Sequence, residues 1–409
     1  MNTEHAYPLN DTNIQVYRQQ WQDELDHILR YWQLHMPDHQ YGGFLGGLDN
    51  DNQPILGAPK GSVLHARILW TFSEAHRFSN NPSLQEIADR AYTYLSGPFT
   101  DPEYGGVFWS LTPDGQVLDT RKQVYAQAFA LYGIAAYYAV KGLPAVREYA
   151  ISLYRLIEQH AADSRHNGYL EAFSLDWGPL DDLRLSAKDA NEKKTANTHL
   201  HIIEAYAALY RVWPDEGLRD RIVNLLVLFD RYFIDPYNGH LRLFFDETWV
   251  EKPDVVSYGH DIEAAWLLQQ CAEVAGDKYW IDRSREHALR LAKASLEGLD
   301  TDGGLWYEFD PHTGQMVREK HWWPQAEAMV GFYHAWQQSQ DDAWRNRSAG
   351  SWTFIQQHII DHRRGEWYWG VTEDYAAMPG QDKAGFWKCP YHNGRACMEM
   401  LERTGGPIA

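Results

Sequence analysis

A turn rich in glycine and aromatic residues recurs six times along the chain, and its spacing limits the architectures open to it. The six turns read YGGFLGG, YGGVFWS, NGYLEAF, NGHLRLF, GGLWYEF and GEWYWGV. Their glycines lie 61 to 71 residues apart, at Gly43, Gly106, Gly168, Gly239, Gly304 and Gly365. Because glycine permits the turn and the aromatic residues cover one face, each unit is predicted to contain a short hairpin or extended segment.

Between these turns lie segments whose apolar residues recur at helical spacing. About two such segments fall in each interval, which makes twelve predicted helices. They cover residues 12–35, 63–78, 85–95, 123–140, 145–160, 198–212, 218–233, 261–275, 280–296, 324–338, 342–358 and 394–403. The repeat is longer than the roughly 20 to 50 residues of the common solenoid repeats.

Twelve helices in six hairpins can close into a ring of six inner and six outer helices, with the glycine turns on one face. We therefore predict an all-α fold, an (α/α)6 barrel of six helical hairpins with short β-hairpin turns on one face. No linker-like stretch divides the chain, so residues 1–409 are predicted to form a single catalytic domain. The alternative, an open superhelix of helical pairs, would expose both terminal units, and the sequence shows no polar capping repeats.

The composition limits the classes of ligand. With 18 Trp, 25 Tyr and 15 Phe the chain has aromatic rings beyond the needs of a core, and such rings beside acids and amides suit a carbohydrate. A large helical fold that simply packs aromatic residues is the alternative. The formal net charge of −19 argues against nucleic acid and anionic membrane surfaces as partners.

The remaining composition bears on location. The three cysteines, Cys271, Cys389 and Cys397, have neither metal-ligand spacing nor a disulfide framework, which fits a reducing compartment. The first ten residues show no signal-peptide pattern, and no apolar run approaches the roughly 18 residues of a membrane span. A cytoplasmic protein without a membrane partner is expected. Monomer and homodimer both stay open.

Each repeat unit places polar or aromatic residues near the start of one helical segment. In order along the chain these are Arg67, Tyr125 with Gln127, Asn197 with His201, His260 with Glu263, Trp323 with Glu327, and His392 with Arg395. Residues three or four apart share a helix face. Because the six positions are comparable, the inner helices of a barrel would bring these side chains to one central pocket.

The residue types in this pocket favour proton transfer. A histidine titrates near neutrality, and a nearby carboxylate can orient it, so His260 and Glu263 have the makings of a general acid/base pair. The sequence lacks the G-x-S-x-G elbow, the G-x-G-x-x-G loop and the P-loop, so a serine nucleophile, a nicotinamide cofactor and a bound nucleotide have no evident site.

Three other interpretations stay open at this point. His201, His260 and His392 with a glutamate could bind zinc or manganese, although His199 and His201, two apart, diverge on a helix. Glu263 and Glu327 could serve as the two carboxylates of a glycoside hydrolase. A barrel that only binds a sugar or a protein partner is the non-enzymatic alternative.

Four longer motifs resemble those of a known family. They are NTHLHIIEAY at 197–206, SYGHDIEAAWLL at 257–268, KHWWPQAEAM at 320–329 and WKCPYHNGRACMEM at 387–400. In this order they resemble the N-acylglucosamine 2-epimerase superfamily and, within it, the cellobiose 2-epimerases. The resemblance implies an (α/α)6 barrel that needs no cofactor and no metal. It also implies epimerisation at C2 of the reducing-end glucose of a β-1,4-linked disaccharide, which would convert cellobiose to glucosyl-mannose and lactose to epilactose.

The resemblance also implies roles for single residues. His260 and His392 would be the two acid/base histidines, with proton transfer through a cis-enediolate, and His201 would assist ring opening. Glu263, one turn from His260, would favour its protonated form. The substrate-binding residues would be Arg67, Tyr125, Asn197, Glu263, Trp323, Glu327 and Trp387, with Asp189 and Trp306 as candidates for the second sugar. A mannobiose 2-epimerase or a monosaccharide epimerase or isomerase of the same superfamily is the alternative.

Overall fold

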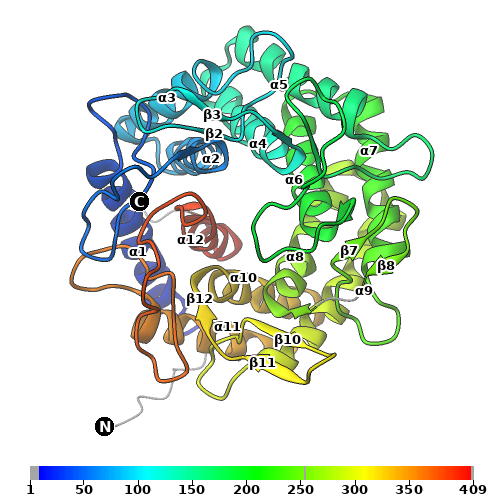
Figure 1. The fold of residues 1–409 in the computed structure, drawn as a ribbon. Coiled ribbons are helices and arrows are strands. Elements are labelled where there is room, and N and C mark those ends of the chain that lie inside the picture. Colours follow the sequence, from blue (N-terminus) through cyan, green and yellow to red (C-terminus); the bar gives the residue numbers. More distant parts are fainter. Residues whose placement is uncertain (1–8, 253–254, 407–409) are drawn as a thin grey trace.

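The computed structural model describes residues 9–252 and 255–406. The first eight residues, which belong to the segment without a signal-peptide pattern, lie outside this part. Within it, twelve α-helices form a closed ring of two layers (Figure 1). The predicted all-α barrel is therefore confirmed. Over the described residues, none of the helices has the length and apolar character that a membrane crossing requires.

The two layers alternate along the chain. The inner helices are α2 (Ser62–Ser79), α4 (Val124–Lys141), α6 (Ala196–Val212), α8 (Tyr258–Ala275), α10 (Trp322–Ser339) and α12 (Tyr391–Arg403). The outer helices are α1 (Ile14–His35), α3 (Pro82–Ser96), α5 (Pro144–Leu156), α7 (Glu216–Leu228), α9 (Lys278–Ala294) and α11 (Asp342–Phe354). Successive inner helices pack against one another, and α12 closes the ring against α2 while α1 packs on α12.

The sequence explains the difference between the layers. The inner helix α4 is apolar on nearly all sides, and every residue from Val124 to Tyr137 is buried. Small residues allow close approach: a Cβ on Gly133 would lie 2.6 Å from the carbonyl oxygen of Ala66 on α2. Outer helices bury one face, and four of the six begin with a side-chain cap. At α3, the Asn81 side chain accepts from the backbone N–H of Ser83, and Pro82 occupies the first helical position.

Short antiparallel strands gather at the end of the barrel where the inner helices begin (Figure 1). They form five small sheets in the orders β1-β2-β3, β4-β5, β6-β7-β8, β9-β10-β11 and β12-β13. Their bounds are β1 Lys60–Gly61, β2 Ser110–Leu111, β3 Val117–Asp119, β4 Lys122–Gln123, β5 Ala172–Phe173, β6 Lys194–Thr195, β7 Phe244–Phe245, β8 Glu251–Lys252, β9 Val256–Ser257, β10 Glu308–Asp310, β11 Gln315–Val317, β12 Lys320–His321 and β13 Gly370–Val371. In five units a strand leads directly into the inner helix, so the helix N-terminus is held at this face.

Each glycine turn is closed by a single antiparallel bridge, as predicted for a short hairpin. The bridges are Pro37 with Phe44, Thr100 with Val107, Ala162 with Tyr169, Ile234 with Leu241, Leu299 with Leu305 and Ile360 with Trp367. Four outer helices run into the turn through one tighter or wider helical turn. These are η1 (Ile157–Ala161), η2 (Phe229–Phe233), η3 (Ser295–Gly298) and η4 (Ile355–Ile359).

A buried side chain from the first turn of each of five inner helices fastens the glycine turn. His65, Gln127, His199, Asp261 and Gln325 accept from the backbone N–H of Phe44, Val107, Tyr169, Leu241 and Leu305, respectively. The bonds are 2.7 to 3.2 Å long. We call these five residues the turn-binding residues. They satisfy a buried backbone donor that no strand pairs, and they account for Gln127 and His199 without a role in chemistry.

Candidate active site

A cavity of about 280 Å³ opens at the N-terminal ends of the inner helices. Ten of the twelve site residues predicted from the sequence line it: Arg67, Tyr125, Asp189, Asn197, His201, His260, Glu263, Trp323, Trp387 and His392. They come from all six inner helices and from the loops before them. The convergence follows from the fold, because each repeat unit starts its inner helix at the same face.

Three histidines face the cavity, and each has its Nδ1 atom bound on the side away from it. His392 Nδ1 lies 2.7 Å from Glu327 Oε1, His201 Nδ1 lies 3.0 Å from Glu204 Oε2, and His260 Nδ1 lies 2.8 Å from Ser257 Oγ. A carboxylate accepts from Nδ1–H and so leaves Nε2 as a base, whereas a hydroxyl can donate to Nδ1 and leave Nε2–H as an acid. The backing groups therefore allow the histidines opposite proton roles.

Burial keeps these imidazoles neutral. Desolvation, with a contribution from His201, lowers the pKa of His260 to about 4. Burial and the nearby guanidinium groups of Arg67 and Arg395 lower the pKa of His392 well below its usual range, and burial lowers that of His201. The expectation that Glu263 favours a protonated His260 is wrong, because Ser257 rather than Glu263 binds this imidazole and its pKa falls.

A positive group and aromatic rings form the rest of the wall. Arg67 is 3% exposed, and its Nη2 donates to the Tyr125 hydroxyl at 2.6 Å. The Trp323 ring lies 4.8 Å from the ring of His260 and 5.6 Å from that of His392, centroid to centroid. Trp387 packs against Tyr125 at 6.0 Å. The cavity thus combines an anion-stabilising donor, acid/base groups and apolar faces that fit a sugar ring.

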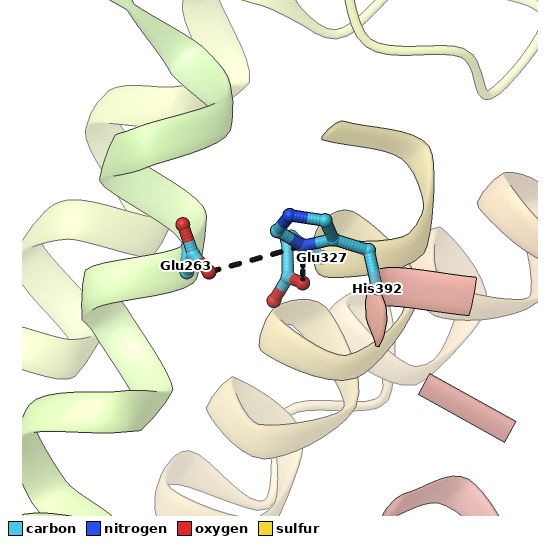
Figure 2. Close-up of side chains that lie close together, drawn as sticks. All are labelled: Glu263, Glu327 and His392. Carbon is cyan, nitrogen blue, oxygen red and sulfur yellow. Dashed lines mark hydrogen bonds and ion pairs between the residues drawn. The ribbon is translucent and has the colours of Figure 1, made fainter. Parts of the chain in front are cut away.

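A cluster of buried charges lies directly beneath the cavity. Arg395 on α12 donates from Nη1 to Glu204 Oε1 at 2.7 Å, and from Nη2 to Glu263 Oε1 at 2.8 Å and Glu327 Oε1 at 2.6 Å. Figure 2 shows Glu263 on α8, Glu327 on α10 and His392 on α12 pointing toward one another. We call Arg395 and these three glutamates the carboxylate cluster. Each of its side chains is at most 5% exposed.

This cluster bears on two of the open interpretations. Among the described residues, Glu263, Glu327 and His392 bring potential metal-ligand atoms within 4.8 Å of one another. Arg395 already neutralises the oxygen atoms that a cation would bind, so the residues fit a guanidinium rather than a metal. The glycoside-hydrolase interpretation needs both carboxyls at the substrate, and Glu327 does not line the cavity.

Comparisons with known proteins agree with the cavity. The family model described as N-acylglucosamine 2-epimerase (GlcNAc 2-epimerase) matches residues 42–396. The chain belongs to the N-acylglucosamine 2-epimerase family. It is accordingly a carbohydrate epimerase, an isomerase.

Individual relatives match this epimerase over nearly its whole length. A cellobiose 2-epimerase from Bacteroides fragilis is 45% identical, covering 95% of this chain and 99% of the relative. The solved cellobiose 2-epimerase of Bacillus thermoamylovorans B4167 has a TM-score of 0.90 at 37% identity, covering 95% of this chain and 100% of the other. A GH76 α-mannanase from Bacteroides thetaiotaomicron, with a TM-score of 0.68 at 10% identity over 96% of this chain and 99% of the other, shares the fold alone.

Two predicted site residues do not line the cavity of the epimerase. Glu327 lies one layer below, where it binds His392. Trp306 points its indole N–H at Asp300 Oδ2, 3.2 Å away, and packs under the Arg318 guanidinium. Its neighbour Tyr307 takes the place that we expected for Trp306.

Several lining residues were missed by the sequence analysis. They are Leu185, Ser186, Lys188, Tyr307, His321, Trp322 and Trp369. Trp322 precedes Trp323 at the start of α10, close to the position where the other repeat units carry their site residues, so the repeat could have indicated it. The others come from loops and strands, where helical spacing gives no signal. His321 stacks on Tyr307 with a centroid distance of 3.9 Å, so the fifth unit contributes a fourth histidine to the wall.

Proposed function

We propose that this epimerase inverts C2 of the reducing-end glucose in β-1,4-linked disaccharides, converting cellobiose to glucosyl-mannose and lactose to epilactose. One observation carries the proposal. His260 and His392 line the same cavity, both close to the Trp323 ring, and they are backed by groups of different hydrogen-bonding character, a hydroxyl and a carboxylate. Inversion without a cofactor needs such a pair, because one face of the carbon loses a proton and the other gains one.

The first step opens the sugar ring, because the C2 hydrogen becomes acidic only beside a free aldehyde. Opening moves the O1 proton to a base and returns a proton to the ring oxygen. His201, whose Nδ1 is bound by Glu204, is the neutral imidazole that we assign to this exchange. Positioned acid/base groups of this kind typically contribute about 10²–10⁴-fold in rate.

The second step forms and collapses a cis-enediolate. His392, with Nδ1 bound by Glu327, removes the C2 proton through Nε2. The electron pair of the C2–H bond moves toward O1, where the Arg67 guanidinium and the Tyr125 hydroxyl stabilise the negative charge. His260 takes up a proton from solvent and donates it to the opposite face of C2, and His392 releases to solvent the proton that it removed; in the reverse reaction the two histidines exchange roles. The Trp323 ring lies beside both imidazoles.

The residues that the loops add to the cavity support a disaccharide. Lys188, Asp189, Tyr307 and Trp369 line the same cavity as the acid/base groups. They provide charge and aromatic surface where a second sugar would lie. The relatives named cellobiose 2-epimerase support the same substrate class.

Proton NMR in heavy water tests the proposal directly. Cellobiose, mannobiose and glucose are each incubated with the purified protein. We expect conversion of cellobiose with deuterium at C2 and little reaction of glucose, and we expect EDTA to leave the rate unchanged. Faster conversion of mannobiose would reassign the substrate while keeping the chemistry. Absence of exchange in every sugar would leave a protein that only binds.

A further inference from the structure

The carboxylate cluster beneath His392 holds more negative than positive charge. Glu204, Glu263 and Glu327 share the one guanidinium of Arg395. With all three carboxyls ionised, the cluster would have a net charge of −2 on side chains that are at most 5% exposed. Uncompensated buried charge is costly, and two carboxyls held close together cannot both ionise easily.

Glu263 and Glu327 meet at the same guanidinium nitrogen and beside the same imidazole. Glu263 Oε1 and Glu327 Oε1 bind the same Nη2 of Arg395, at 2.8 and 2.6 Å. His392 Nδ1 lies 2.7 Å from Glu327 Oε1 and 3.9 Å from Glu263 Oε1. Arg395 is itself held by Tyr391 and Trp266, whose ring centroids lie 4.1 and 4.8 Å from its Cζ.

We propose that Glu263 and Glu327, clamped by Arg395, share one proton beneath His392, and that the position of this proton sets how strong a base His392 is. The inference rests on the proposed function, because it concerns the histidine assigned to C2. The guanidinium acts through the glutamates and is a positioning residue.

The shared proton allows the cluster to follow the reaction. When His392 Nε2 accepts the C2 proton, the imidazolium still donates Nδ1–H to Glu327. The shared proton then resides on Glu263, so that the full negative charge stands on Glu327 beside the new positive charge. No proton is gained or lost by the carboxyls, and the shared state is restored when His392 releases the proton that it took from C2. In agreement, burial and Glu327 raise the pKa of Glu263 to about 8, and burial raises that of Glu327.

The other titratable groups around His392 keep their protonation states in this scheme. Burial raises the pKa of Glu204, but Arg395 and His201 outweigh it and hold the value at about 2, so Glu204 is ionised throughout. Arg67 on α2 bonds Tyr125 and stays charged. The neutral His201 on α6 and His260 on α8 complete the titratable surroundings of His392. Only the Glu263–Glu327 pair is left to respond.

Two variants should shift the pH profile of kcat/KM in opposite directions. We call the pH at which kcat/KM falls on acidification the acid limb. Glu263→Gln leaves Glu327 fully ionised, which strengthens His392 as a base and should raise the limb by about one pH unit. Glu327→Gln removes the charge beside Nδ1 and should lower the limb by a similar amount, with a loss in kcat. Arg395→Lys keeps one charge but cannot bridge three carboxyls, so kcat should fall at least about tenfold with little change in KM. Arg403→Lys on the same helix is the matched control.

Infrared spectroscopy tests whether the cluster holds a protonated carboxyl, and it does so without catalytic turnover. A protonated carboxyl has its own C=O stretch, so the difference spectrum between wild type and Glu263→Gln at pH 7 should show the loss of one such band. Glu171→Gln, which changes a buried carboxyl outside the cluster whose pKa burial raises to about 8, calibrates the signal.

If the band is unchanged, or if both glutamine variants move the acid limb in the same direction, the shared proton does not exist. Wild-type inactivity on every sugar would refute the function while leaving the infrared result readable. If Glu327→Gln does not fold, Glu263→Gln alone tests the shared proton, through the loss of its C=O band and the shift of its acid limb to higher pH.

Discussion

At the scale of residues, the low basicity of the buried histidines predicts the pH dependence of the epimerase. An unperturbed histidine has a pKa of about 6.5. Burial lowers the pKa of His260 to about 4, and burial together with Arg67 and Arg395 lowers that of His392 well below its usual range. The neutral base therefore persists to lower pH, and kcat/KM should stay flat below pH 6.5 before it falls. His392→Ala should lower kcat by about 10²–10⁴-fold. His166→Ala, at an exposed position, is the control, and an acid limb above pH 7 would contradict the burial argument.

The same scale shows how far the sequence could predict the site. The three acid/base histidines lie near the starts of inner helices, at comparable positions of the repeat: His201, His260 and His392. The repeat therefore predicted that they converge. Lys188 and Trp369 lie in loops whose path depends on tertiary packing, and no periodicity marks them. The pairing of His260 with Ser257 instead of Glu263 was equally hidden, because both lie within three residues and only the helix start at Tyr258 decides between them.

At the scale of elements, the turn-binding residues hold the active-site face together. Gln325 on α10 accepts from the N–H of Leu305 at 2.7 Å and donates to its carbonyl at 2.8 Å, with full burial. Gln325→Ala would leave both backbone groups unsatisfied, at a cost of about 1–3 kcal/mol for each buried polar group. A calorimetric scan should show a lower Tm, whereas Gln357→Ala at an exposed site should not change it. Equal Tm values would mean that water replaces the side chain.

Of the turn-binding residues, Gln127 was placed in the central pocket by the sequence analysis and His199 was considered as a metal ligand, and no role was assigned to the other three. The glycine turns and helical periods predicted the hairpins and the ring, because each signal is local. The polar residue at the fourth position of the inner helix repeats with the same period, at His65, Gln127, His199, Asp261 and Gln325. Three residue types fill the position, since the backbone N–H needs only an acceptor. A comparison of the repeat units by residue identity therefore misses this position, whereas a comparison by the ability to accept a hydrogen bond would find it.

At the scale of the whole molecule, the two ends of the chain close the barrel. The last inner helix, α12, packs on the first outer helix, α1, so the sixth helical pair joins residues from both ends. Arg18 on α1 is buried, and it donates to the Leu401 carbonyl at 3.2 Å, to Thr404 Oγ1 at 2.9 Å and to the Gly406 carbonyl at 2.6 Å. Because α12 bears His392, a contact far from the cavity holds one acid/base group in place.

Arg18→Ala should therefore lower stability and leave the unfolding cooperative. One buried carbonyl, that of Leu401, and two half-buried acceptors, the Thr404 hydroxyl and the Gly406 carbonyl, would lose their donor, which predicts a loss of about 2–4 kcal/mol in the free energy of unfolding. Since the ring has no free edge, thermal unfolding followed by circular dichroism and by epimerase activity should give one coincident transition at a lower Tm. Arg30→Ala, exposed on the same helix, should leave the Tm unchanged. If activity disappears well before the helical signal, α12 detaches on its own, and the barrel is held by five pairs rather than by a closed ring.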